Sequence, residues 1–172
     1  MQKFLIVPVN SDIIALEKIF KEKNISAVLL LRGIDNEKTY EKYIRKILPL
    51  TQKYQIACLL DNCPNLAKKI GADGVHMSTD IKNLREAVRD LKPDMIVGAG
   101  NINSKDDAMK KGEAKVDYVF FGDLNGEKTS QETYDLASWW AKTFEVPAVF
   151  YDPQNKAENT GCEFSASYFD LN

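Results

Sequence analysis

Short apolar runs recur along the whole chain, and segments with helical periodicity separate nearly all of them. The runs are Phe4–Val9, Ala27–Leu31, Ile56–Leu60, Gly74–Met77, Met95–Ala99, Asp117–Gly122, Pro147–Tyr151 and Cys162–Phe169. The expected helices are Asp12–Lys23, Asn36–Tyr54, Pro64–Ile70, Ile81–Leu91, Ser104–Lys111 and Ser130–Phe144. This alternation is typical of parallel strands that are joined by crossover helices.

Eight such strands are the number that closes a (β/α)₈ barrel, which we favour over an open doubly wound sheet. The 172 residues predict a single domain, residues 1–172. Because such barrels usually need about 250 residues, this one should be minimal, with shortened or missing last helices. An incomplete outer ring would leave apolar surface bare, so we expect a homodimer partner or a loosely packed edge to cover it.

Composition excludes several classes of protein. The net charge of −2, with lysines and arginines spread along the chain, lacks the basic patch of a nucleic-acid binder. No stretch is long enough to span a bilayer, and the N-terminus lacks the features of a signal peptide. The three cysteines have no Cys-x-x-Cys spacing and are expected to be reduced thiols. We therefore expect a cytoplasmic protein with neither nucleic-acid nor membrane partners.

The residues that follow each apolar run should form the functional site, because active sites of such barrels lie at the carboxyl ends of the strands. These residues are polar and largely acidic. They are Asn10-Ser11, Arg32-Gly33, Asp61-Asn62, Ser78-Thr79-Asp80, Gly100-Asn101, Asp123-Leu124-Asn125, Asp152-Pro153 and Asp170.

Four segments, "LLDNCPNLAKKI", "GADGVHMS", "IVGAGNIN" and "VDYVFFGDLNGEKT", together resemble the thiamine phosphate synthase family, including its thiazole tautomerase (TenI-like) relatives. The resemblance spans roughly residues 4–168 and is most specific in the middle. It implies a (β/α)₈ barrel that transfers a hydroxymethylpyrimidine group from its diphosphate to a thiazole phosphate in thiamine biosynthesis, with Mg²⁺ holding the diphosphate.

Carried over residue by residue, the resemblance keeps only part of the diphosphate and metal site. The family's Gln-x-Arg-x-Lys pattern becomes Leu30, Arg32 and Ile34, so only the arginine matches. The family's Asn-Asp pair appears in swapped order, which leaves Asp61 as one Mg²⁺ ligand, and Asp80 is the residue that could supply the second. Each has another interpretation. Arg32 could neutralise Asp61, and both aspartates could serve the helices that follow them.

The phosphate and proton-transfer residues are also reduced. A Ser and a His-Thr pair of the family have become Gly100 and Ile102-Asn103, so no histidine remains there for tautomerase chemistry. Asn101 and Asn103 could contact a ligand or simply shape the turn and cap the next helix. Lys128 in "GEKT" could contact phosphate or be a solvated loop residue. At the seventh and eighth strand ends, the family's Gly-Gly and Ser are replaced by "YDPQN" and "YFDLN", whose proline and aspartates disfavour an anion.

His76, the only histidine, lies inside the expected fourth strand. We interpret it as a neutral, hydrogen-bonded core residue rather than a base or ligand. The sequence thus predicts a thiamine phosphate synthase-like barrel whose catalytic and phosphate-binding motifs are partly lost, so that its enzymatic activity is doubtful. It would bind a small phosphorylated or heterocyclic ligand. The alternatives are a non-catalytic binding or regulatory protein on the same scaffold, and an enzyme with altered chemistry at the acidic rim.

Overall fold

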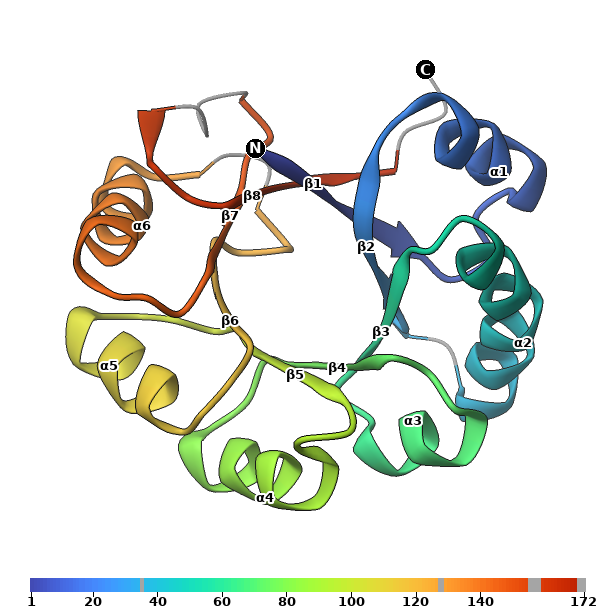
Figure 1. The fold of residues 1–172 in the computed structure, drawn as a ribbon, viewed down its shortest axis with the longest axis horizontal. Coiled ribbons are helices and arrows are strands. Elements are labelled where there is room, and N and C mark those ends of the chain that lie inside the picture. The colour runs from blue at the N-terminus through green and yellow to red at the C-terminus, as the bar shows by residue number, and fades with distance from the viewer. Residues whose placement is uncertain (35, 127–128, 155–158, 170–172) are drawn as a thin grey trace.

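The computed structural model describes residues 1–34, 36–126, 129–154 and 159–169. Eight parallel strands close into one barrel in the order of the chain, and strand β8 pairs with β1 (Figure 1). The strands are β1 (Gln2–Pro8), β2 (Ile25–Leu31), β3 (Ala57–Asp61), β4 (Gly74–Met77), β5 (Ile96–Ala99), β6 (Tyr118–Phe121), β7 (Ala148–Tyr151) and β8 (Phe164–Tyr168). The predicted α/β barrel is confirmed.

Six helices pack around the outside of this barrel (Figure 1). They are α1 (Ile13–Glu22), α2 (Glu37–Lys53), α3 (Pro64–Ile70), α4 (Ile81–Leu91), α5 (Lys105–Glu113) and α6 (Gln131–Thr143). Five of them begin at a side-chain cap that accepts a hydrogen bond from a backbone N–H of the first turn, as helix starts favour. The caps are Asp12, Asn36, Asp80, Ser104 and Ser130.

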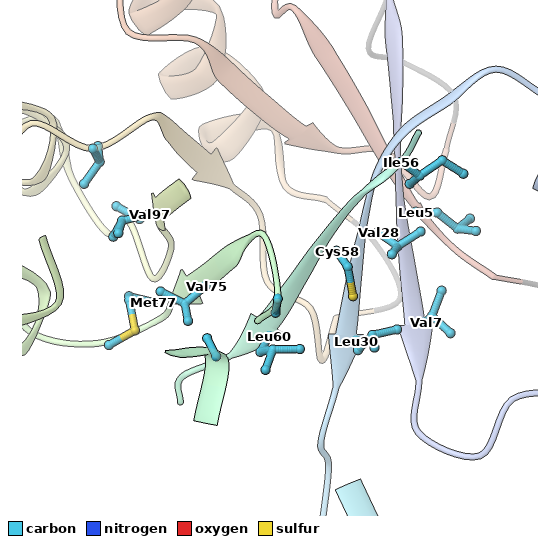
Figure 2. Close-up of a cluster of buried hydrophobic side chains, with 14 of the residues drawn as sticks. Leu5, Val7, Val28, Leu30, Ile56, Cys58, Leu60, Val75, Met77 and Val97 are labelled. Carbon is cyan, nitrogen blue, oxygen red and sulfur yellow. The ribbon is translucent and has the colours of Figure 1, made fainter. Parts of the chain in front are cut away.

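The alternation of side chains along each strand divides the core into two layers. Phe4, Ile6 and Leu29 point into the barrel, where Tyr118 and Phe120 meet them. The intervening side chains form a second cluster with residues of the helices. Figure 2 shows the strand side chains of this cluster, among them Leu5, Val28 and Leu60. The strands therefore read as continuous apolar runs because both of their faces are buried.

The outer ring is incomplete at β7 and β8, where the described residues form no further α-helix. The outward side chains of β8 are Ser165 and Ser167, whereas Ala166 between them faces the barrel interior. In the described part of the chain, the outer face of β8 is therefore polar. Within the described residues, no helix has the length and apolar character needed to cross a membrane.

Candidate functional site

A cavity of about 640 Å³ opens at the carboxyl ends of the strands. Polar residues from the loops after β3 to β6 dominate its walls, and its floor includes His76 and Phe120. The described residues that line it are Leu31, Gly33, Asp61, Asn62, His76, Ser78, Asn101, Ile102, Asn103, Phe120, Gly122, Asp123, Leu124, Asn125 and Thr133. The cavity therefore lies at the carboxyl ends of the strands, where we expected the site.

Asp61 ends β3 and lines this cavity. Its Oδ1 accepts a hydrogen bond from Asn62 Nδ2 at 3.1 Å, and its Oδ2 accepts one from the backbone N–H of Arg32 at 3.4 Å. Burial raises the pKa of Asp61, while the hydrogen bond from Arg32 and the arginine's positive charge oppose that rise. Arg32 lies beside Asp61, as the alternative interpretation expected, and it is absent from the described cavity walls.

Asp80 lies apart from this cavity and begins helix α4. Its Oδ1 accepts from the backbone N–H of Asn83 at 2.8 Å, and its Oδ2 accepts from Asn83 Nδ2 at 3.2 Å. These are the contacts of an N-terminal cap, which both oxygens of the carboxylate serve. The structure does not bring Asp61 and Asp80 together. Within the described ranges, no group of three or more His, Cys, Asp or Glu side chains is arranged to hold a metal ion.

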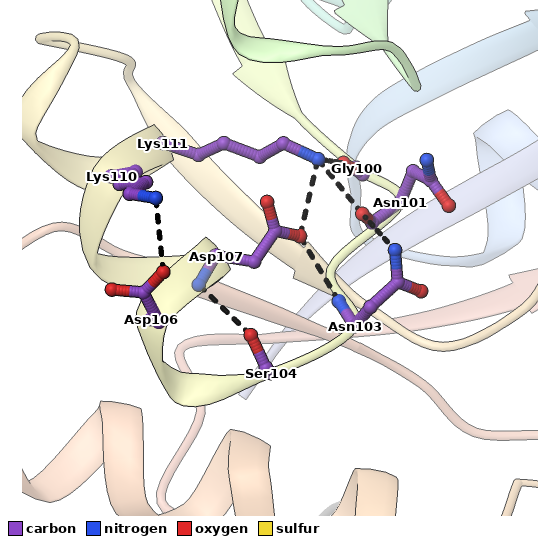
Figure 3. Close-up of polar contacts among 8 residues, drawn as sticks. All are labelled: Gly100, Asn101, Asn103, Ser104, Asp106, Asp107, Lys110 and Lys111. Atoms are coloured by element: carbon purple, nitrogen blue, oxygen red, sulfur yellow. Dashed lines mark hydrogen bonds and ion pairs between the residues drawn. The ribbon is translucent and has the colours of Figure 1, made fainter.

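The loop between β5 and α5 carries Asn101 and Asn103, and both line the cavity. A buried lysine of α5 holds this loop from behind: Lys111 Nζ donates to the carbonyl oxygens of Gly100 at 3.2 Å and Asn101 at 2.8 Å (Figure 3). Asp107 pairs with the same ammonium at 3.3 Å and accepts from the backbone N–H of Asn103 at 3.1 Å. Asn101 takes a left-handed backbone conformation (φ 56°), which asparagine tolerates better than most residues.

His76 lies at the inner end of the cavity and is 1% exposed. Its Nδ1 is 2.8 Å from the hydroxyl of Tyr118, and Phe120 packs edge-on against its ring. Burial lowers the pKa of His76 to about 4, so the ring is neutral at physiological pH. The structure agrees with the neutral, hydrogen-bonded imidazole that we expected, and it adds the contact with the cavity.

Two tyrosines, Tyr151 and Tyr168, end β7 and β8 and bond to the loop after β6. Tyr151 donates a hydrogen bond to the carbonyl oxygen of Gly126 at 3.2 Å, and Tyr168 donates to that of Leu124 at 2.5 Å. Their rings meet edge to face with centroids 5.9 Å apart. The described cavity walls accordingly include no residue of β7 or β8. Asp152 is buried but lies outside the cavity walls as well.

Sequence reasoning did not assign a role at this site to Lys111, Tyr118 or Tyr168. One signal for Lys111 was present: it follows the apolar Ala108 by three residues on the same helix, so it lies on the buried face. Tyr118 and Tyr168 were indistinguishable from ordinary core residues in the sequence. The predicted phosphate contact Lys128 and the C-terminal Asp170 lie outside the described residues.

Comparisons with known proteins place this geometry in context. A family model described as thiamine monophosphate synthase matches residues 5–151. The thiamine-phosphate synthase of Rhodospirillum centenum is 37% identical over 110 residues, which are 62% of this chain and 53% of that protein. The thiamine-phosphate synthase of Erythrobacter litoralis is 30% identical over 125 residues, 69% of this chain and 58% of that protein. The chain thus spans little more than half the length of these curated relatives.

Among solved structures, the thiamine phosphate pyrophosphorylase of Pyrococcus furiosus superimposes with a TM-score of 0.79 at 16% identity. The match covers 97% of this chain and 85% of that protein. At this identity the likeness shows the barrel fold alone, whereas the family model covers most of the sequence. From its sequence, with a fold that agrees, the chain belongs to the thiamine monophosphate synthase family.

Proposed function

We propose that this barrel binds a small heterocycle of the kind that its family handles and catalyses the family's diphosphate transfer weakly or not at all. The observation that carries the proposal is the position of Tyr151 and Tyr168 at the ends of β7 and β8. Barrels of this class usually bind phosphate with the loops after their last two strands. In this chain Tyr151 and Tyr168 occupy that part of the mouth and bond to the loop after β6.

The diphosphate pattern after β2 supports the same conclusion. Leu30, in place of the family's amide, packs in the outer layer of the core and faces away from the cavity. Ile34, in place of the family's lysine, is fully exposed. No lysine or arginine side chain lies among the described residues of the cavity wall, while Asp61 and Asp123 do. A diphosphate placed there would meet two carboxylates, and Arg32, which lies outside the described walls, already offsets the charge of Asp61.

The residues for Mg²⁺ do not fit a two-carboxylate site. Asp80 is engaged at the start of α4, and Asp61 alone of the predicted pair reaches the cavity. Mg²⁺ is usually held by one or two carboxylates together with phosphate oxygens of the substrate. Because Asp61 is the one carboxylate of the predicted pair in the described cavity wall, we propose that Mg²⁺ binds weakly, and the proposed function needs no metal-dependent step.

An activity assay combined with a binding measurement tests this proposal. The chain is incubated with the pyrimidine diphosphate, the thiazole phosphate and Mg²⁺, with the Rhodospirillum centenum synthase in parallel as the positive control. We expect that the control forms thiamine phosphate and that this chain forms none above the uncatalysed background. Turnover that is removed by Asp61→Ala would contradict the loss of activity.

Calorimetry with unphosphorylated hydroxymethylpyrimidine separates a binding protein from a bare scaffold. We expect measurable binding to this chain, and weaker binding of the corresponding diphosphate because of Asp61 and Asp123. Absence of binding by both compounds would favour the alternative, a regulatory or interaction protein that uses the barrel only as a scaffold.

A further inference from the structure

His76 and Tyr118 form a buried polar pair inside the barrel, at the inner end of the cavity. The tyrosine hydroxyl lies 2.8 Å from His76 Nδ1, and the two rings stack with centroids 5.8 Å apart. Gly98 on β5 makes room for this arrangement, since a Cβ atom at that position would lie 1.9 Å from the Tyr118 ring. The pair is therefore built into the strands and does not depend on a loop.

The hydrogen-bonding needs of Tyr118 decide which nitrogen of His76 carries the proton. Burial raises the pKa of Tyr118 well above its usual range, so the hydroxyl keeps its hydrogen. Among the described residues, its hydrogen bond is the one to His76 Nδ1. A buried hydroxyl that donates to Nδ1 requires that nitrogen to be unprotonated, which places the ring hydrogen on Nε2.

Nε2 is a buried nitrogen without a hydrogen-bond partner in the part of the chain that the structure describes. It lies on the side of the ring that faces Ser78 and Gly100. A Cβ atom at Gly100 would lie 2.6 Å from Nε2 and 2.9 Å from Ser78 Oγ. Buried donors in folded proteins nearly always have an acceptor. Since His76 belongs to the cavity wall, a molecule bound in the cavity is the natural source of that acceptor.

We propose that His76, with its tautomer fixed by Tyr118, is a hydrogen-bond donor at the inner end of the cavity and binds an uncharged acceptor atom of a small heterocycle through Nε2–H. This inference rests on the proposed function and names the chemistry of its ligand. A ring nitrogen or a carbonyl oxygen fits the subsite. An anion does not, because the described walls carry Asp61 and Asp123 and no basic side chain.

The single histidine makes the tautomer directly measurable. In the full chain labelled with ¹⁵N-histidine, long-range ¹H–¹⁵N correlation spectra contain one imidazole pattern. We expect an unprotonated Nδ1 and a protonated Nε2 at pH 7. Tyr118→Phe should remove this preference, whereas Tyr43→Phe should not, because Tyr43 donates to the Ser11 carbonyl on another part of the barrel. A proton on Nδ1 in the wild-type chain would overturn the proposal.

Ligand titration tests the donor role with two matched probes. Hydroxymethylpyrimidine carries ring nitrogens, and 2-aminobenzyl alcohol keeps the amino and hydroxymethyl groups without them. We expect the Nε2 resonance to shift with the pyrimidine and not with the benzyl alcohol. His76→Phe should weaken pyrimidine binding on the order of tenfold, with Tyr43→Phe as the control.

The outcomes separate this inference from the proposed function. Pyrimidine binding without any change at Nε2, or with equal affinity for His76→Phe, would reject the His76 subsite and leave the proposed function standing. Failure of the pyrimidine to bind would reject both. Equal affinity for both probes would show that the cavity binds by shape and that no acceptor atom is used.

Discussion

Burial decides the charge state of His76 and links it to stability. In the folded chain the ring is packed against Tyr118 and Phe120, and its pKa falls to about 4 from the usual 6.5. In the unfolded chain the ring is solvated and binds a proton below pH 6.5. Between pH 6.5 and 4 the unfolded state therefore holds more protons than the folded state, so stability falls as the pH is lowered through this window.

A pH series of unfolding measurements tests this linkage. We expect His76 to contribute roughly 2 kcal/mol of lost stability between pH 7 and pH 5, from a slope near 1.4 kcal/mol per pH unit. The measurement is the free energy of unfolding in urea for the wild-type chain and for His76→Gln, which cannot gain the charge. The difference in pH dependence between the two isolates the histidine from the carboxylates. Parallel pH profiles would show that the ring is solvated in the folded chain.

The sequence predicted that His76 is neutral, but it did not predict that Tyr118 is its hydrogen-bond partner. An apolar strand predicts a buried ring, and burial alone predicts neutrality. The hydroxyl of Tyr118 reaches across β5 only because residue 98 has no side chain. That close approach depends on how β4, β5 and β6 are placed in the barrel. No periodicity along the chain contains this information.

At the scale of elements, the β5–α5 loop shows how one helix shapes one wall of the cavity. Lys111 is 3% exposed in its side chain, and its ammonium binds two loop carbonyls and Asp107. The preceding residue, Lys110, forms the same kind of pair with Asp106, but these side chains are 61% and 72% exposed. The chain thus provides a buried and a solvated lysine–aspartate pair on the same helix.

Removing each lysine should separate their contributions. We expect Lys111→Met to lower the free energy of unfolding by about 3 kcal/mol, because one buried carbonyl, one partly buried carbonyl and a partly buried carboxylate lose their partner. Lys110→Met should change it by less than about 0.5 kcal/mol, as exposed pairs contribute little. Urea unfolding measures both. Similar values for the two variants would show that the loop does not depend on Lys111.

The sequence predicted the bounds of the strands and helices better than it predicted the polar contacts of their side chains. Apolar runs located all eight strands, although β8 spans Phe164–Tyr168 within the longer predicted run Cys162–Phe169. Asp80 had two interpretations in the sequence, a metal ligand and a helix cap, because the same residue type serves both. The placement of its oxygens against Asn83 favours the cap.

At the scale of the whole molecule, eight strands close a barrel, and the described residues after α6 form no further α-helix. The strand count predicted the closure, since fewer strands would leave open edges. The polarity of the outer face of β8 was not predicted from the sequence. Its outward residues are serines, Ser165 half-buried and Ser167 exposed, where an apolar face was expected.

This polar face changes what we expect of the oligomer. We predicted a homodimer because we expected apolar surface to be left uncovered. The exposed large hydrophobic residues of the described chain lie elsewhere than β8: they are Met1, Ile14, Ile34 and Met109. We therefore expect a monomer at micromolar concentration in sedimentation or light-scattering experiments. A wild-type dimer would show that another face carries an interface.

Placing an apolar face on β8 should promote self-association of the chain. The double variant Ser165→Leu, Ser167→Leu places two branched apolar side chains on the strand where no described helix covers it. Burying such side chains contributes about 1.5 to 3 kcal/mol each, which is enough to drive self-association at high concentration. Ser165→Thr, Ser167→Thr keeps the hydroxyls and serves as the control. If light scattering found both variants monomeric, another part of the chain would have to cover β8. The serines would then not be the reason that this face does not associate.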